Sequence, residues 1–280
     1  MRRILFLILC LLPLHTLRSE PTNASHSIVH SQWYSHEEHI FRRVDIYLPA
    51  GYCCDSDYTT LYLLHGINGY EGSWEDIGHV ADTMELLVSQ GLCKPMIIVM
   101  PDCNKWPFKE RPVSHGNLWK CLMHYGRLSR EHEIEHSISD LMDMMDTVYQ
   151  VSPYYAIAGL SDGARMAANA ANIRPDRFRD VGLFSPVLHK DQLPKDSTQT
   201  YYIYVGNRDI FYGYGSRFHR RLRRAGHPHQ FVRSRGGHNW RVWRQCLSAF
   251  LRQLGANADT AQSADGPNSR SDSENHCTSF

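Results

Sequence analysis

The sequence predicts a single α/β domain in which a mostly parallel central sheet is flanked by helices. Short apolar runs bounded by Gly, Pro, Asp and Asn alternate along the chain with segments of helical periodicity. The length of 280 residues is close to what one such sheet and its helices occupy. Apolar residues make up 42% of the chain, which is enough to bury a sizeable core. We therefore expect parallel strands joined by crossover helices.

The predicted strands differ in how far they are covered. Arg43–Leu48 alternates polar and apolar residues, which is typical of a half-exposed strand. Thr60–Leu64 and Met96–Met100 are apolar runs, as in strands that are buried on both faces. Further strands are predicted at Tyr155–Ala158, Val181–Phe184, Tyr201–Val205 and Gln230–Arg233.

The predicted helices lie between and after these strands. Glu131–Tyr149 carries apolar residues at helical spacing, and other helices are expected at Gly163–Ile173, Ser216–Ala225 and Trp240–Leu254. From Gly255 onward the chain is rich in Ala, Asp, Asn, Ser and Gln with almost no apolar residues. Such a segment cannot bury enough surface to offset the entropy of ordering, so residues 255–280 are predicted to be a disordered tail.

The N-terminus has the order of a secretory signal peptide, because Met1, Arg2 and Arg3 precede an apolar run over residues 4–14. The run is too short to span a bilayer comfortably. We expect removal of residues 1–19, although cleavage after Ala24 also presents a small residue. The folded domain then covers residues 26–254, in a secreted, periplasmic or cell-surface protein without stable membrane insertion. An uncleaved anchor is the alternative.

Charge and cysteine content limit the partners. The formal net charge is +1, so no overall field favours nucleic acid or anionic lipid, and no nucleic-acid partner is expected. Seven cysteines remain once Cys10 leaves with the signal peptide, so at least one stays unpaired. No Cys or His spacing is typical of a zinc site, and we expect neither a metal nor a cofactor.

The motif with the clearest chemistry is G-x-S-x-G over residues 159–163, with Ser161 at its centre. It follows the apolar segment Tyr155–Ala158 and precedes an Ala-rich stretch, so its context is strand, tight turn and helix. In such a turn the serine has a strained backbone, and a side chain at Gly159 or Gly163 would collide with the adjoining strand or helix. The pattern predicts a nucleophilic serine.

A serine hydroxyl needs a histidine base and a carboxylate to act as a nucleophile at neutral pH. In this class of fold the order is serine, carboxylate, histidine. Asp209 lies just past a predicted strand, where open α/β sheets place functional loops, and His238 lies between the next strand and the last helix. We predict that Ser161, Asp209 and His238 act together.

Acyl transfer also needs backbone donors for the oxyanion. One is expected to be the N–H of Asp162, directly after the serine, and the other the N–H of Ile67, in the loop after an early strand. His65 precedes Gly66 in this loop. We interpret His65 as a structural side chain that shapes the loop through a hydrogen bond.

These motifs resemble the putative-esterase family of α/β-hydrolases, which includes feruloyl and other carbohydrate esterases, S-formylglutathione hydrolases and mycolyltransferases. The similarity covers roughly Val44–Leu254. It is carried by Leu61–Gly66 with Trp74, Ile97–Asp102, Ala156–Gly163, Arg174–Phe178, and Gly237–Trp240 with Trp243. The resemblance implies the α/β-hydrolase fold and a Ser161, Asp209, His238 triad that hydrolyses carboxylic esters through an acyl-enzyme.

One departure from the family is Asp162, where its members usually have Met or Gln. The N–H is kept, but a carboxylate is now expected near the mouth of the site. Either it disfavours anionic acyl groups or it pairs with a basic residue such as Arg165.

Together with export, the resemblance implies an esterase for acylated carbohydrate, with a small-molecule or polysaccharide ester as substrate. An acyltransferase and a non-catalytic binding protein of the same fold are the alternatives, but a decayed member typically loses the serine or the histidine. The candidate substrate contacts are aromatic: Trp74, Trp106 and Trp240, with Trp119 and Tyr212 as further possibilities. The basic stretch Arg217–Arg224 is interpreted as a solvated helix face, and binding of an anionic polymer is its alternative.

Overall fold

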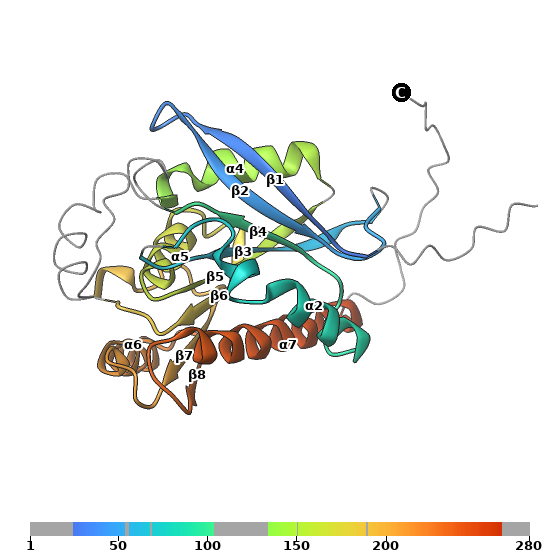
Figure 1. The fold of residues 1–280 in the computed structure, drawn as a ribbon. Helices are drawn as coiled ribbons and strands as arrows, with labels where there is room; N and C mark the ends of the chain where they lie inside the picture. The colour runs from blue at the N-terminus through green and yellow to red at the C-terminus, as the bar shows by residue number, and fades with distance from the viewer. Residues whose placement is uncertain are drawn as a thin grey trace, which may run out of the picture.

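The protein folds around one eight-stranded sheet in the order β1-β2-β4-β3-β5-β6-β7-β8 (Figure 1). The computed structural model describes residues 25–53, 56–67, 69–103, 134–149, 151–188 and 190–264. The strands are β1 (Ser27–Ser35), β2 (Ile40–Leu48), β3 (Tyr58–Leu64), β4 (Ile97–Pro101), β5 (Val151–Leu160), β6 (Phe178–Phe184), β7 (Thr200–Gly206) and β8 (His229–Ser234). β1 and β2 pair antiparallel with each other and β2 with β4, and every other pairing is parallel. The predicted α/β class is confirmed.

Helices cover both faces of the sheet. They are α1 (Ser73–Asp76), α2 (Val80–Ser89), α4 (Ile134–Val148), α5 (Asp162–Ile173), α6 (Tyr212–Ala225) and α7 (Trp240–Ala264), with a short 3₁₀ turn, η2 (Lys190–Gln192). The buried side chains of α4, α5 and α6 belong to one core cluster, and those of α2 and α7 belong to a second. The sheet therefore separates two apolar layers.

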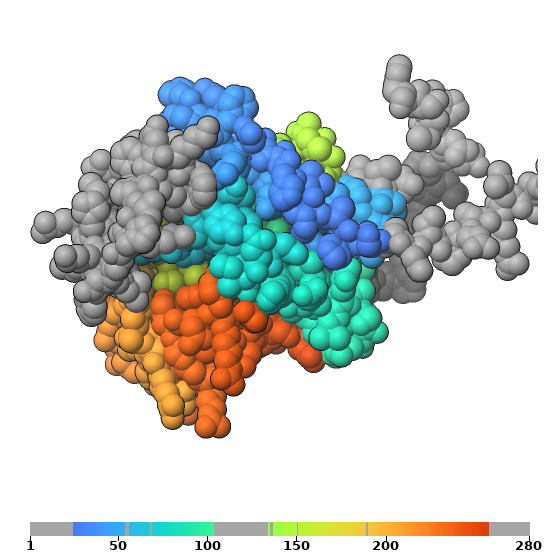
Figure 2. Space-filling view, viewed as in Figure 1, coloured from blue at the N-terminus to red at the C-terminus, as the bar shows by residue number. Residues whose placement is uncertain are grey.

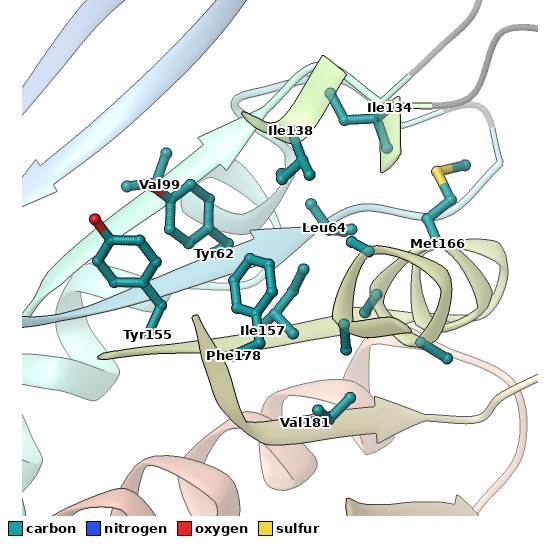
Figure 3. Close-up of a cluster of buried hydrophobic side chains, with 14 of the residues drawn as sticks. Tyr62, Leu64, Val99, Ile134, Ile138, Tyr155, Ile157, Met166, Phe178 and Val181 are labelled. Atoms are coloured by element: carbon teal, nitrogen blue, oxygen red, sulfur yellow. The ribbon is translucent and has the colours of Figure 1, made fainter. Parts of the chain in front are cut away.

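The central strands contribute to both layers, which explains why they are apolar without alternation. On β3, Tyr62 and Leu64 belong to the first cluster, whereas Leu61 and Leu63 belong to the second. Figure 3 shows the first cluster, in which the Tyr62 ring packs edge-on against Phe178 at 5.7 Å between centroids. Aromatic pairs of this kind stabilise a core by about 0.5–1.5 kcal/mol beyond the burial of their area.

Four elements were not predicted: β1, α2 and the two short elements α1 and η2. β1 is an edge strand whose residues are mostly exposed or half-buried, so it lacks an apolar run. α2 buries Val80, Met84 and Leu87 at helical spacing, a signal that the sequence does contain. All of the predicted helices and strands appear in the structure. Apart from the C-terminal end of α7, their ends differ from the predicted ones by a few residues.

The boundary predicted after Leu254 is wrong for the first part of the tail, because α7 continues to Ala264. Gly255 is buried, and a Cβ at this position would lie 2.8 Å from the Leu92 carbonyl oxygen. The glycine that suggested an end of structure instead allows the helix to pack closely against the turn after α2. Residues 265–280 and the predicted signal peptide lie outside the described residues.

Four cysteines lie in the described part of the chain, namely Cys53, Cys93, Cys103 and Cys246, and of these Cys93 and Cys246 are buried free thiols. Burial raises the pKa of the Cys93 thiol to about 12 and that of Cys246 to about 12. Thiols with such a raised pKa are poor nucleophiles, so we assign Cys93 and Cys246 to packing. None of the described helices is long and apolar enough to cross a membrane.

The half-buried carboxyl group of Asp180 on β6 is expected to affect how stability depends on pH. Burial raises the pKa of Asp180 above its ordinary value, although its carboxylate accepts hydrogen bonds from the Tyr202 hydroxyl and the Asn257 amide, each at 3.0 Å. The folded protein therefore holds this proton more tightly than the unfolded chain does. Stability falls as the pH rises from the ordinary pKa of about 3.9 through the raised one.

Asp180→Asn keeps an acceptor oxygen but carries no charge, so we expect a higher Tm than that of the wild type near pH 7 and a smaller gain near pH 3. The control is Asp196→Asn, because a bond from the Thr198 N–H lowers the pKa of Asp196. That variant should gain nothing at neutral pH. Thermal unfolding at both pH values measures the difference, and a loss of Tm near pH 7 in Asp180→Asn would contradict the assignment.

Candidate active site

Ser161 occupies a sharp turn between β5 and α5. Its backbone has φ +55° and ψ −114°, a conformation that a non-glycine residue rarely adopts. The turn is held by a hydrogen bond from the Ser161 N–H to the Phe184 carbonyl on the neighbouring strand, at 2.8 Å. A Cβ at Gly159 would lie 2.3 Å from the Gly163 carbonyl oxygen, and a Cβ at Gly163 would lie 2.3 Å from the His65 carbonyl oxygen. Both glycines of the motif are therefore required by close backbone packing.

The structure brings Ser161, His238 and Asp209 together from three different loops. His238 Nε2 lies 3.0 Å from Ser161 Oγ, and His238 Nδ1 lies 3.1 Å from each carboxylate oxygen of Asp209. Asp209 follows β7, and His238 lies between β8 and α7. All three positions are at the carboxyl ends of parallel strands, which meet at one edge of the sheet.

The hydrogen-bond pattern assigns the imidazole tautomer. The carboxylate of Asp209 only accepts, so Nδ1 of His238 carries the proton and donates it. Nε2 is then free to accept the Ser161 O–H. A histidine in this state can take the serine proton as the oxygen attacks.

Asp209 is ionised in spite of its burial. Burial alone would raise the pKa of its carboxyl, but hydrogen bonds from His238, Ser185 and the Phe211 N–H outweigh it and lower the pKa below its ordinary value. The Phe211 N–H donates at 2.7 Å. The carboxylate is thus a fixed negative charge beneath the imidazole, which favours the imidazolium that forms during proton transfer.

Ser185 is a part of the site that the sequence analysis did not identify. It follows β6, is fully buried and has φ +52°. Its hydroxyl hydrogen-bonds the Asp209 carboxylate and accepts the indole N–H of Trp243 at 3.0 Å. The position of Ser185 at the carboxyl end of a parallel strand was an available signal, but a lone serine in a loop has no distinguishing neighbours. Ser185 is a positioning residue for Asp209.

Ser185→Ala is expected to lower kcat by about tenfold with KM unchanged, because Asp209 loses one of the donors that fix its orientation. The mutation removes only a hydroxyl, so steady-state kinetics on a small ester should show the split in an enzyme with near-wild-type Tm. A rise in KM at constant kcat would contradict the assignment of Ser185 as a positioning residue for Asp209.

The loop that follows β3 forms one wall beside Ser161. The buried imidazole of His65 accepts the Cys103 N–H at Nε2 (2.9 Å), and its Nδ1 lies 2.8 Å from the Gly66 carbonyl oxygen. His65 is therefore neutral, with its proton on Nδ1, and it fixes the backbone that leads to Ile67. This matches the structural interpretation of His65. The Asp162 N–H lies at the start of α5, where helical N–H groups have no partner within the helix.

A cleft of about 180 Å³ opens over Ser161. It is lined by Gly66, Ile67, Gly69, Tyr70, Ser73, Ile77, Leu160, Ser161, Phe211, His238, Trp240 and Trp243. Most of these side chains are apolar or aromatic, as is usual for a pocket that binds a small organic group. Among the residues that the structure describes, no group of three or more His, Cys, Asp or Glu side chains is arranged to hold a metal ion.

The aromatic predictions have different outcomes. Trp240 lines the cleft. The prediction for Trp74 is wrong, because Trp74 is fully buried behind the cleft wall, donates its N–H to the Leu64 carbonyl oxygen and packs edge-on against Trp240. It supports the cleft from the core. Trp106 and Trp119 lie outside the described residues, and Tyr212 packs against Phe231 on β8.

Asp162 pairs with Arg165 one helical turn further on, where Arg165 Nε lies 2.8 Å from Oδ1. Both side chains are largely buried. Of the two roles considered for Asp162, the structure favours the ion pair, which reduces the negative charge that an incoming acyl group meets.

The sheet order and the triad at this edge of the sheet place the chain in the α/β-hydrolase fold class. The chain belongs to the family described as Putative esterase, whose pattern it matches over residues 41–202. It is 28% identical over 220 residues to an endo-1,4-beta-xylanase/feruloyl esterase of Xylanibacter ruminicola, a match that covers 75% of this chain and 29% of that protein. The chain thus corresponds to less than a third of the length of this relative.

Solved structures of low sequence identity share the fold. A ferulic acid esterase of Anaeromyces mucronatus is similar with a TM-score of 0.69 and 22% identity, covering 86% of this chain and 95% of that one. An S-formylglutathione hydrolase of Staphylococcus aureus has a TM-score of 0.60 and 18% identity, covering 84% and 98%.

Proposed function

We propose that this chain is a secreted serine esterase that hydrolyses carboxylic esters on acylated carbohydrate through an acyl-enzyme. The observation that carries the proposal is the hydrogen-bonded chain from Ser161 Oγ through His238 to Asp209 at the floor of an apolar cleft. A serine with a positioned base and a buried carboxylate is the arrangement that acyl transfer requires.

In the first half-reaction, Ser161 Oγ attacks the ester carbonyl carbon while its proton passes to His238 Nε2. The negative charge that develops on the carbonyl oxygen is stabilised by the N–H groups of Ile67 and Asp162. The imidazolium then gives its proton to the leaving alcohol oxygen as the ester C–O bond breaks. The products are the free alcohol and an acyl group on Ser161.

In the second half-reaction, water takes the place of the alcohol. His238 removes a proton from the water as its oxygen attacks the acyl carbon, and the proton returns to Ser161 Oγ when the acyl–serine bond breaks. The carboxylic acid leaves, and the hydroxyl and the neutral imidazole are restored. Asp209 stays ionised throughout and holds the imidazole in position.

The cleft supports a compact acyl group, aromatic or short. Its volume of about 180 Å³ suits one ring or a few carbon atoms, and Phe211, Trp240 and Ile77 offer apolar contact. Relatives named as a feruloyl esterase and a ferulic acid esterase support a feruloyl ester as the substrate. An acetyl ester of a sugar is the short acyl alternative.

The test is a substrate panel for the purified 280-residue chain with feruloyl, acetyl-sugar and p-nitrophenyl acetate esters, each compared with Ser161→Ala. Labelling by a fluorophosphonate probe, mapped by mass spectrometry, identifies the nucleophile independently of the substrate. We expect turnover and labelling in the wild type and neither in Ser161→Ala. Equal turnover by the two proteins would refute the mechanism. Transfer of the acyl group to an added sugar instead of to water would identify an acyltransferase.

A further inference from the structure

The C-terminal third of the chain carries a charge imbalance that the net charge of +1 conceals. Residues 210–258 contain ten arginines, no lysine, and none of the chain's 29 acidic residues. This segment comprises α6, β8 and most of α7, and its orange and red atoms form adjoining surface in Figure 2. A local field of one sign is therefore confined to one part of the molecule.

Four of these arginines form a stripe along α6, at helical positions i, i+3, i+4 and i+7. We call Arg217, Arg220, Arg221 and Arg224 the arginine stripe. Arg217, Arg220 and Arg224 are exposed, whereas Phe218 and Leu222 on the opposite side of the helix are buried. Like charges three and four residues apart on a helix repel one another, so the stripe has a cost in stability.

No carboxylate in the described part of the chain forms an ion pair with the stripe. In the described part of the chain, every arginine–carboxylate ion pair uses an arginine between Arg42 and Arg177. Within the stripe, Arg217 instead stacks over the Tyr214 ring at 4.7 Å, and Arg220 donates to the Ser216 hydroxyl at 2.9 Å. A helix face that is merely solvated usually mixes charges of both signs, which this face does not.

Aromatic rings connect the stripe to the active site. The His238 ring contacts Phe211 edge-on with centroids 4.9 Å apart, and Phe211 contacts Tyr214 at 6.1 Å. Tyr214 in turn lies beneath Arg217. Phe211 also lines the cleft, so a chain of contacts leads from Ser161 to the stripe. A polymer whose ester lies in the cleft can reach these arginines along α6.

We propose that the arginine stripe binds the acidic groups of a polysaccharide whose ester is hydrolysed at Ser161, so that the substrate is an acylated polymer bearing carboxylates or sulfates. This proposal rests on the proposed function and specifies its substrate class. Arginine binds carboxylate and sulfate oxygens with two parallel hydrogen bonds, which a lysine does not. Acidic polysaccharides present acyl esters and anionic groups on the same chain.

The chemistry of the stripe favours a polysaccharide over a lipid surface. Helices that lie in a membrane interface place large apolar residues among or opposite their basic residues. The large apolar residues of α6, Phe218 and Leu222, are buried against the sheet, and none of its exposed residues is a large hydrophobic one. α6 therefore has charge to offer to a partner but no apolar face.

The test compares two triple variants with the wild type. One replaces Arg217, Arg220 and Arg224 by glutamine, which removes charge and keeps helix propensity, and the other replaces them by lysine, which keeps charge. Binding is measured by affinity electrophoresis with polygalacturonate, dextran sulfate and uncharged dextran. Poly(U) RNA and vesicles of equal parts phosphatidylcholine and phosphatidylserine serve as competing anions.

We expect the wild type to bind polygalacturonate or dextran sulfate at about 10 mM salt and to release it near about 1 M, where screening is strong. The glutamine variant should bind at least about tenfold more weakly, with the lysine variant intermediate. Tighter binding of polygalacturonate would indicate that the stripe prefers carboxylates, and tighter binding of dextran sulfate would indicate that it prefers sulfates. On acetylated polygalacturonate, KM should rise in the glutamine variant with kcat unchanged, and turnover of p-nitrophenyl acetate should stay constant in all three proteins.

Equal polysaccharide binding by the wild type and the glutamine variant overturns the proposal, as does arginine-dependent binding that is tighter to poly(U) or to the vesicles. These outcomes do not depend on catalysis. A chain that binds the polymer through the stripe but hydrolyses no ester would refute the proposed function instead. Removal of like-charge repulsion should leave the Tm of the glutamine variant unchanged or higher, so weaker binding would not reflect unfolding.

Discussion

Replacement of His238 by alanine is expected to lower kcat on a carboxylic ester by about 10⁴- to 10⁶-fold. His238 Nε2 accepts the proton of Ser161 across 3.0 Å, and without it the hydroxyl remains a weak nucleophile. The loss should be in kcat, because the imidazole is proposed to act on bonds that change during the reaction rather than on the bound ester. Fluorophosphonate labelling of Ser161 should be lost in parallel.

The chain offers a matched control in His36→Ala. His36 also hydrogen-bonds a carboxylate through Nδ1, at 3.0 Å from Asp140 Oδ1, but it lies on the surface away from the cleft residues. Its variant should keep kcat within about twofold, since exposed pairs of this kind contribute little. A His238→Ala enzyme that retains a tenth of wild-type kcat would exclude His238 as the general base.

The site residues that could be predicted from the sequence are those in motifs that combine local geometry with chemistry. The turn at Ser161 could be predicted because its whole signal lies in a short stretch of sequence: an apolar segment, the two glycines and a helix-forming segment. Asp209 and His238 were found by their order and by their place after strands. Their distances from Ser161 depend on long-range strand pairing, which only the structure shows.

The role of a side chain could not be predicted from the sequence where that role depends on tertiary packing. Trp74 and Trp240 look alike as aromatic residues near predicted loops, yet one is fully buried and the other lines the cleft. Ser185 supports Asp209 from the loop after β6, which comes close to Asp209 only because β6 pairs with β7. The arginine stripe was visible as a basic stretch, but the absence of carboxylate partners among the described residues is a property of the fold.

Substitution of Gly163 by alanine is expected to destabilise the fold by about 3 kcal/mol or more, one of the largest effects available from a single methyl group. The added Cβ would lie 2.3 Å from the carbonyl oxygen of His65 and 2.7 Å from that of Leu64. Both contacts are with backbone atoms at the end of β3, which cannot rotate away as a side chain can. The start of α5 and the loop toward Ile67 must then separate.

Gly215→Ala is the matched control for the steric clash. It makes the same substitution inside α6, at a position where the added methyl group has enough space. A Cβ at Gly215 would lie 3.7 Å from Ile203 and Pro186, an ordinary packing distance. Alanine also favours a helix over glycine by about 0.5–1 kcal/mol, so this variant should be as stable as the wild type or more stable. In thermal unfolding we expect Gly163→Ala to lower Tm by roughly 6–12 °C and Gly215→Ala not to lower it. Equal Tm values for the two variants would mean that the close approach of α5 to the β3 loop is not required for folding. The presence of glycine at position 163 would then have to be explained by the geometry of the reaction alone.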